Sequence, residues 1–192
     1  QDLIYRVYTM PSKFGRVFRV GVTKSLTANT VLIHVISRDK NKELTLANDA
    51  LKDNIATYIN EYRLISDSYD IVDAAIVNIG IDYVVVTSRG SNGNAVISRC
   101  NNALKTYLQT QNMQIGKPIN KTDLMNIIIN VEGVESLSSI IVRNKSGSQE
   151  GRIYSNVRMS IAENTSKQKI YPTRGGIFEI KYPNADIRGA IQ

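Results

Sequence analysis

Few side chains in this sequence are of the types that carry out covalent catalysis. The chain has one histidine, His34, and one cysteine, Cys100. His34 sits inside an apolar run, where a structural histidine is the more common finding, although the role of a catalytic base stays open. Cys100 falls on the apolar side of a predicted helix, where a thiol packs as a small hydrophobic group. A nucleophile needs a base beside it. Nothing in the spacing brings these two residues together, so we expect no enzyme activity and no small-molecule substrate.

Acidic residues and one glycine-rich loop are the remaining candidates for ligand binding. The densest carboxylates, Asp67, Asp70, Asp73 and Asp82, lack the alternating ligands, central glycine and final glutamate of a calcium loop. Paired carboxylates of the glycosidase type stay open, while a polar turn followed by solvated strand positions is the simpler interpretation. The loop 90–93 precedes a predicted helix and could hold a phosphate. It lacks the Lys-Ser/Thr of a P-loop and the third glycine of a dinucleotide site, which favours a flexible connection.

Composition narrows the protein class further. The chain has 192 residues, of which 42% are hydrophobic and 21% charged, as expected for one large or two small soluble domains. A single cysteine excludes a disulfide framework within the chain and a cysteine-based zinc site, and a single histidine excludes a histidine-rich cage, so we expect no metal and no cofactor. No apolar run reaches the roughly 18–20 residues of a membrane span, so no membrane partner is expected. The start at Gln1, without a methionine or a charged leader, suggests a mature fragment or a piece of a longer protein.

Charge is unevenly distributed along the chain. The net charge of +7 comprises +5 over residues 1–45, −4 over 46–90, +2 over 91–150 and +4 over 151–192. Three interpretations stay open: a nucleic-acid-binding module that uses the basic ends, a homo-oligomer in which basic ends meet acidic middles, and an ordinary solvated surface. The basic residues near the start are spaced singly rather than gathered on one element, which disfavours nucleic acid as a partner.

The hydrophobic pattern predicts strands and helices in alternation. Consecutive β-branched and apolar residues over 30–37 indicate a strand buried on both faces, and Gly80 is expected to separate two strands. The predicted elements are strands 17–23, 30–37, 71–79, 81–87 and 134–143 and helices 46–62, 94–111 and 121–131, with Asn94 and Asn120 as the caps of the last two. This order predicts an α+β fold, with mixed β-sheets and helices packed on one face.

The composition of the chain changes after Arg143, where a flexible link is predicted over 144–151. Strand-like runs at 152–161 and 176–182 then flank an exposed loop and carry too few apolar residues for a core of their own. We therefore expect three parts, listed here with their boundaries: an N-terminal α/β module over 1–68, an α+β module over 69–145, and an extended C-terminal arm over 146–192 that lies on its own domain or on another subunit. Tyrosine and arginine are enriched at interface hot spots. The candidate interface residues of this arm are Tyr171, Arg174, Phe178, Tyr182 and Arg188.

An ordered set of short motifs resembles a known protein family. Between Val72 and Val142 these motifs are Asp82-Tyr83-Val84-Val85-Val86, Ala103-Leu104-Lys105-Thr106-Tyr107-Leu108, Ile115-Gly116-Lys117-Pro118-Ile119, the run from Asp123 to Val131, and Val131-Glu132-Gly133-Val134-Glu135. This block resembles the C-terminal module of baseplate J-like proteins of contractile phage tails. Three further runs look like the baseplate wedge protein of T-even-type myophages: Met10 to Val20, Asn54 to Arg63, and Tyr171-Pro172-Thr173-Arg174-Gly175-Gly176.

The resemblance implies a structural role without catalysis. Wedge proteins of this family join around the tail hub into a ring of the baseplate, and they pair with copies of themselves and with neighbouring wedge subunits. The ring rearranges when the sheath contracts. From the resemblance we expect a two-fold homodimer in the virion tail baseplate, assembled in the host cytoplasm. We also expect the chain to correspond to the C-terminal portion of a longer protein.

Overall fold

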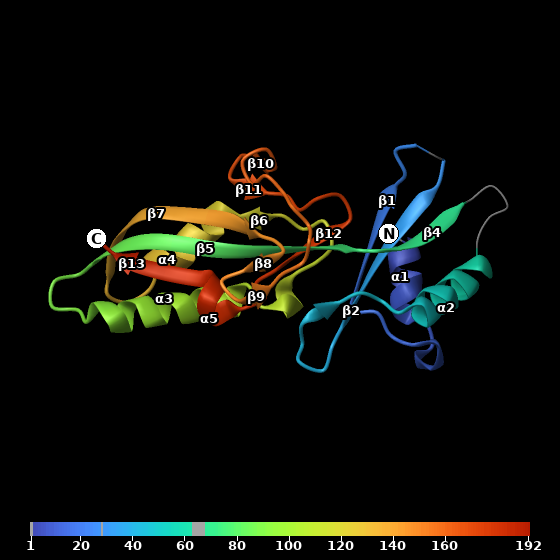
Figure 1. Ribbon diagram of the computed structural model, residues 1–192, viewed down its shortest axis with the longest axis horizontal. Coiled ribbons are helices and arrows are strands. Elements are labelled where there is room, and N and C mark those ends of the chain that lie inside the picture. Colours follow the sequence, from blue (N-terminus) through green and yellow to red (C-terminus); the bar gives the residue numbers. More distant parts are fainter. Residues whose placement is uncertain (1, 28, 63–67) are drawn as a thin grey trace. The chain divides into compact units, whose positions relative to one another are not determined.

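The chain forms two compact units in the computed structural model, which describes residues 2–27, 29–62 and 68–192 (Figure 1). Unit 1 consists of Gln1–Ile76, Gln114–Gly116 and Thr173–Ile177, and unit 2 consists of Val77–Met113, Lys117–Pro172 and Phe178–Gln192. The residues of the predicted arm therefore contribute to both units.

Unit 1 is built on a four-stranded sheet whose central strand is β2 (Val31–Arg38). The strands β1 (Arg19–Lys24) and β3 (Leu44–Thr45) pair with β2 antiparallel, and β4 (Tyr69–Asp73) pairs with it parallel. Helix α1 (Asp2–Thr9) contacts β1, and helix α2 (Asp49–Asn60) contacts β4. Their shared core consists of Val7, Met10, Val20, Ile33, Val35, Ala47, Leu51, Ile55 and Ile59.

The strand β2 is buried on both faces, as its run of apolar residues predicts. Ile33 and Val35 belong to the core beneath the two helices, while His34 and Ile36 point to the opposite face and are buried as well. The prediction for the following helix was too long at its start. Helix α2 begins at Asp49 because the side chain of Asn48 accepts a hydrogen bond from the backbone N–H of Leu51 at 2.8 Å.

The sheet of unit 2 is organised around β5 (Ala75–Thr87), whose first two residues belong to unit 1. The strand β7 (Val134–Lys145) pairs with β5 antiparallel, β13 (Ile187–Ile191) pairs with it parallel, and β12 (Gly176–Glu179) joins the same sheet. The predicted break at Gly80 is wrong, because β5 runs through this residue. A Cβ at Gly80 would lie 3.1 Å from the backbone oxygen of Asp186, so glycine permits a close approach of the chain here rather than a turn.

Helices α3 (Gly93–Tyr107) and α4 (Lys121–Ile129) cover this sheet. They contact each other, α3 contacts β13, and α4 contacts β7. The prediction of Asn120 as a cap is confirmed, since its side chain accepts a hydrogen bond from the N–H of Thr122 at 3.1 Å. The prediction that Asn94 caps α3 is wrong. Asn92 caps α3 by accepting from the N–H of Ala95 at 3.2 Å, so the glycine-rich loop closes the start of the helix with its own side chain.

Short elements complete the chain. They include the hairpin of β8 (Ser148–Gln149) and β9 (Arg152–Ile153), a small sheet of β6 (Ile119–Asn120), β10 (Thr165–Ser166) and β11 (Lys169–Ile170), helix α5 (Pro183–Asp186), and the 3₁₀ helices η1 (Ser12–Phe14) and η2 (Thr110–Asn112). Mixed sheets combined with helices confirm the predicted α+β class. Among the described residues, no helix has the length and apolar character needed to cross a membrane.

Candidate functional site

His34 is enclosed within unit 1. Its Nε2 atom lies 2.9 Å from the hydroxyl oxygen of Thr23, and Gly175 lies against its ring, where an added Cβ would overlap it. Burial lowers the pKa of His34, and the positive charge of Arg174 lowers it further, while a hydrogen bond with the backbone of Asp73 acts in the opposite direction. A hydroxyl, a backbone group and a glycine around the ring are the environment of a structural histidine.

Cys100 is enclosed within unit 2, on the buried side of α3. Its side chain is 0% exposed, and burial raises the pKa of the thiol, which keeps it protonated and unreactive. Its neighbour Tyr83 donates hydrogen bonds to Asn101 Oδ1 at 2.7 Å and to the backbone oxygen of Ile97 at 3.3 Å. Burial raises the pKa of Tyr83 as well. This region therefore positions α3 on the sheet.

The candidate carboxylates Asp70, Asp73 and Asp82 do not gather into a ligand site in the part of the chain that the structure describes. Asp67 lies outside the described residues, and Asp70 is exposed. The other two carboxylates form ion pairs, Asp73 with Lys52 and Asp82 with Arg143, each at 2.9 Å. Over residues 2–27, 29–62 and 68–192, no three His, Cys, Asp or Glu side chains are grouped so that they could hold a metal ion.

Four of the five candidate interface residues keep surface exposure, but they do not belong to one unit. Tyr171 is 43% exposed, and Arg188 is exposed beside Glu150. Tyr182 is half-buried, and its ring packs edge to face on Tyr154. These three lie in unit 2. Arg174 lies in unit 1 and donates a hydrogen bond to the backbone oxygen of Lys24.

Phe178 differs from the other four candidates. It lies in β12 and is 1% exposed, so side chains of this same chain enclose it. The sequence places Phe178 among few apolar neighbours, whereas strand pairing surrounds it with the buried residues of β5. Its physical role is therefore that of a core residue.

A row of alternating charges crosses the sheet of unit 2. Arg143 of β7 pairs with Asp82 of β5 at 2.9 Å. Arg188 of β13 is the register partner of Asp82, and Arg188 forms an ion pair with Glu150, which Arg152 also contacts at 3.4 Å. Arg188 lowers the pKa of the Glu150 carboxyl. We call Arg143, Asp82, Arg188 and Glu150 the charge row.

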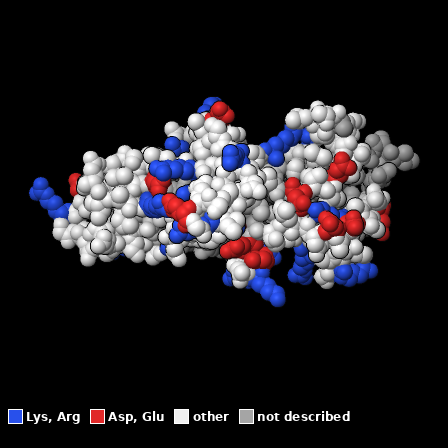
Figure 2. Space-filling view, viewed as in Figure 1, with Lys and Arg blue, Asp and Glu red and all other residues white. Residues whose placement is uncertain are grey.

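An uncharged surface lies beside the charge row, on the face of the sheet that α3 and α4 leave free. Tyr83 contacts α3, so Asp82, Val84 and Val86 point the other way. Their partners on β7 and β13 share that face. We use the name open sheet face for the charge row taken together with six uncharged residues, which are Val84, Val86, Ser136, Ser139, Ile141 and Ala190. Figure 2 shows its uncharged part as white surface toward the C-terminal ends of β5 and β13.

Sequence reasoning did not single out the open sheet face as a candidate site. The alternation of Asp82, Val84 and Val86 does indicate that these three side chains share one face. However, their neighbours Ile141 and Ala190 join them only through pairing between distant strands. The strand pairing is not visible in the spacing of the residues, so this part of the surface required the structure.

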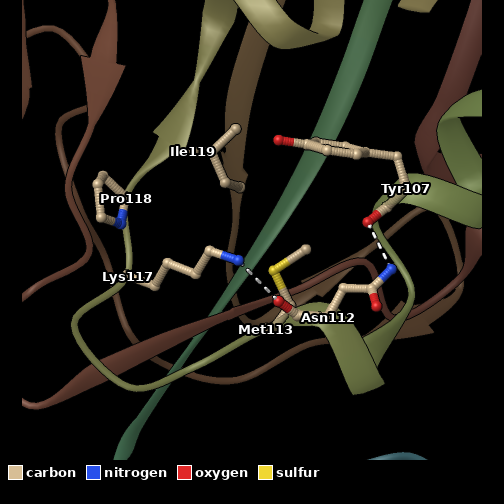
Figure 3. Close-up of a pocket in the computed structure, with 6 residues that line it drawn as sticks. All are labelled: Tyr107, Asn112, Met113, Lys117, Pro118 and Ile119. Atoms are coloured by element: carbon tan, nitrogen blue, oxygen red, sulfur yellow. Dashed lines mark hydrogen bonds between the residues drawn. The ribbon is translucent and has the colours of Figure 1, made fainter.

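Unit 2 also has a pocket of about 300 Å³ (Figure 3). Its walls come from the end of α3, from η2 and from the turn that leads into β6. Lys117 donates a hydrogen bond to the backbone oxygen of Asn112 at 3.3 Å, and Asn112 donates one to the backbone oxygen of Tyr107 at 3.1 Å. Buried Met113 and Ile119 make its floor apolar. The pocket could hold an apolar side chain, but its lining residues do not pair a nucleophile with a base.

Comparisons with known proteins find one similar fold among the solved structures described here. No protein-family model matches the sequence, and no curated protein sequence matches it. The fold is similar to a chain in the cryo-electron-microscopy structure of the anti-feeding prophage baseplate, symmetrised six-fold, with a TM-score of 0.55 and 8% sequence identity. The similarity covers 100% of this chain and 37% of that chain, so this chain spans just over a third of the baseplate protein's length.

Proposed function

We propose that this chain is a structural subunit of a contractile-tail baseplate. The observation that carries the proposal is that the whole chain, both units included, follows the fold of part of a baseplate protein. A match confined to one unit would support only a common domain shape. The motifs that resemble those of baseplate J-like proteins point to the same class, and they support the proposal independently of the fold.

In this proposal the chain acts by assembly rather than by chemistry. The interiors of the two units hold His34 and Cys100 in their neutral forms, which suits packing and not proton transfer. The surface provides exposed aromatic, apolar and charged side chains, and these side-chain types occur in protein interfaces. Its partners are copies of itself and other wedge proteins of the baseplate, and its place is the virion tail after assembly in the host cytoplasm.

The test is to find the protein in particles and to remove it from them. Contractile particles are purified from a producing strain, their sheaths and tubes are stripped, and the remaining baseplates are analysed by mass spectrometry. The expected result is this chain in the baseplate fraction. Deletion of its gene is expected to leave no complete baseplates in negative-stain electron microscopy, and a plasmid copy should restore them. Absence of the chain from purified baseplates, or intact baseplates after deletion, would overturn the proposal.

A further inference from the structure

The strand β1 forms one edge of the sheet in unit 1, and its centre has no charged side chain. Among the described residues, β1 pairs with β2 and with no other strand. Its central residues 20–23 read Val-Gly-Val-Thr, and charged residues stand only at its two ends. Edge strands of this composition offer their backbone groups to a strand of another molecule. On the other side of β2, by contrast, β4 carries Asp70 and Asp73, and charged residues disfavour such pairing.

The hydrogen bonds of β1 identify which of its backbone groups face outward. In an antiparallel pair, alternate residues direct their N–H and C=O groups away from the partner strand. The N–H of Val20 donates to the hydroxyl oxygen of Tyr8 at 3.0 Å, and the carbonyl oxygen of Val20 accepts from Nε2 of Gln114 at 3.2 Å. Val20 therefore faces outward. Val22 and Lys24 follow it at intervals of two residues, so they face outward as well.

Side chains of this same chain bond to outward-facing groups at both ends of β1. Tyr8 and Gln114 bond to the first end, and Arg174 donates a hydrogen bond to the carbonyl oxygen of Lys24 at the second. We call Tyr8, Gln114 and Arg174 the edge clasp. Val22 is the one outward-facing residue between the two points of attachment. A single residue is too short for another strand to pair with while the clasp is in place.

Two loops of unit 1, 114–116 and 173–177, hold the edge clasp in position. In the first loop, Ile115 lies on Gly21, where an added Cβ would overlap its side chain. In the second loop, the backbone lies on the ring of His34 in the same way. A backbone hydrogen bond of 2.8 Å joins the two loops to each other. Each loop thus packs on the face of the sheet and turns one polar side chain, a member of the clasp, to its edge.

We infer that the edge clasp closes β1 to strand addition and so prevents the protein from associating through the backbone of this edge. The clasp bonds to the same N–H and C=O groups that an incoming strand would use, so the two compete directly. Arg174, which the sequence suggests as an interface residue, acts here as a barrier to one kind of contact. The inference does not depend on the proposed function, because it concerns the chain by itself in solution.

Removal of the edge clasp tests the inference. The triple variant Tyr8→Phe, Gln114→Ala, Arg174→Ala keeps an aromatic ring in α1 but no longer bonds to β1. Below its unfolding temperature, it should form thioflavin-T-positive aggregates about fivefold faster than the native chain or more. Infrared spectra of the aggregates should show the amide I band of intermolecular β-structure, which a dimer formed through other surfaces does not give. A triple variant that stays as soluble as the native chain would overturn the inference.

Three matched variants separate loss of the clasp from loss of stability. Arg38→Ala and Gln149→Ala each remove a side chain that donates to a backbone oxygen elsewhere, that of Lys42 or of Ser146. Tyr5→Phe removes an exposed hydroxyl from α1. All three should aggregate at the native rate, and urea unfolding measures the stability of every variant. If a combination of these three accelerates aggregation as much as loss of the clasp does, general destabilisation is the cause and the inference is wrong.

A proline in β1 distinguishes strand addition from aggregation through unfolding. Lys24 is exposed and its N–H faces outward, so Lys24→Pro removes a donor that the pairing with β2 does not use. Added to the triple variant, this change should bring aggregation back toward the native rate without raising the free energy of unfolding. A quadruple variant that aggregates as fast as the triple variant would show that β1 is not the route, and it would refute the role of the clasp.

Discussion

At the scale of single residues, burial shifts the pKa values of three groups, those of His34, Cys100 and Tyr83, in the direction that favours their uncharged forms. Burial lowers the pKa of His34 and raises the pKa of Cys100 and of Tyr83. A catalytic nucleophile or base is activated by the opposite arrangement, in which a partner stabilises the charged form. These three residues therefore stabilise the fold, and two measurements can check this.

The first measurement is the pH dependence of stability, which we expect His34→Gln to flatten near pH 6.5. Burial lowers the pKa of folded His34 below its ordinary value of 6.5, so the unfolded chain takes up a proton first as the pH falls. This contribution to the free energy of unfolding is complete above 6.5 and is lost as the pH falls from there to the folded pKa. Below the folded pKa it stays constant. Urea unfolding of both proteins across this range measures the difference.

Two controls make the His34 result specific. Thr23→Val removes the hydroxyl next to Nε2 but keeps the imidazole, so it should retain the pH dependence. The Glu150 carboxyl has a pKa below its ordinary 4.5 and loses its stabilising effect only in more acidic solution. Equal slopes near pH 6.5 for the native chain and His34→Gln would contradict the enclosed, neutral histidine.

The second measurement is thiol labelling of Cys100. Because the side chain is 0% exposed and its pKa is raised, the native protein should react with a maleimide only as fast as it opens or unfolds. Denaturant should bring the rate to that of a free thiol. Rapid labelling of the folded chain would instead indicate an accessible thiolate and would revive an enzymatic hypothesis.

At the scale of elements, the start of α3 offers a comparison between two asparagines in the same loop. Asn92→Ala removes the side chain that accepts from the N–H of Ala95 and should destabilise the protein by about 1 kcal/mol. Asn94→Ala lies inside the first turn, where alanine is the better helix former, and should be neutral or slightly stabilising. Chemical unfolding of both variants measures the free energies. A larger loss for Asn94→Ala would place the cap where the sequence alone suggests it.

The elements that could be predicted are those whose own residues determine them. The run 30–37 is apolar on consecutive positions and indeed forms a strand buried on both faces, and Asn120 caps its helix. Gly80 misled the prediction because glycine favours turns in general, and only the approach of the Asp186 backbone explains it within a strand. The C-terminal strand β13 was missed because Ile187–Ile191 is short and is interrupted by Arg188 and Gly189. It forms because β5 offers a partner.

At the scale of the whole molecule, the same distinction holds for the candidate site. Ordered motifs in the sequence already suggested the class of protein that we propose. The charge row could not be predicted from the sequence, because its four residues come from separate segments of the chain. Asp82, Arg143, Glu150 and Arg188 meet only through strand pairing. Exposure could not be predicted either: Phe178 was expected at an interface but lies in the core of the structure.

The distribution of charge predicts how the protein meets nucleic acid. Two basic side chains near the start make contacts within unit 1. Arg6 forms an ion pair with Asp2 at 2.9 Å, and the Arg19 guanidinium lies 4.2 Å from the centre of the Phe18 ring. We therefore expect no retardation of DNA or RNA in gel-shift measurements at low salt. A protein that neutralised six phosphates would show binding that falls with salt at a log–log slope of about −5. Observation of such a slope would favour the alternative, a nucleic-acid-binding module that uses the basic ends.

The late position of β13 in the chain has a consequence for biosynthesis. Its register pairs Ile187 with Ile81 and Ile191 with Val85. One side of β5 therefore has no strand partner until residues about 100 positions later have been synthesised. Until the ribosome has released them, the nascent polypeptide leaves the ring of Tyr83 and its apolar neighbours uncovered. Contacts of such high sequence separation slow folding and prolong the time in which chaperones or aggregation compete. The sheet of unit 2 is thus completed only after synthesis has reached Ile191.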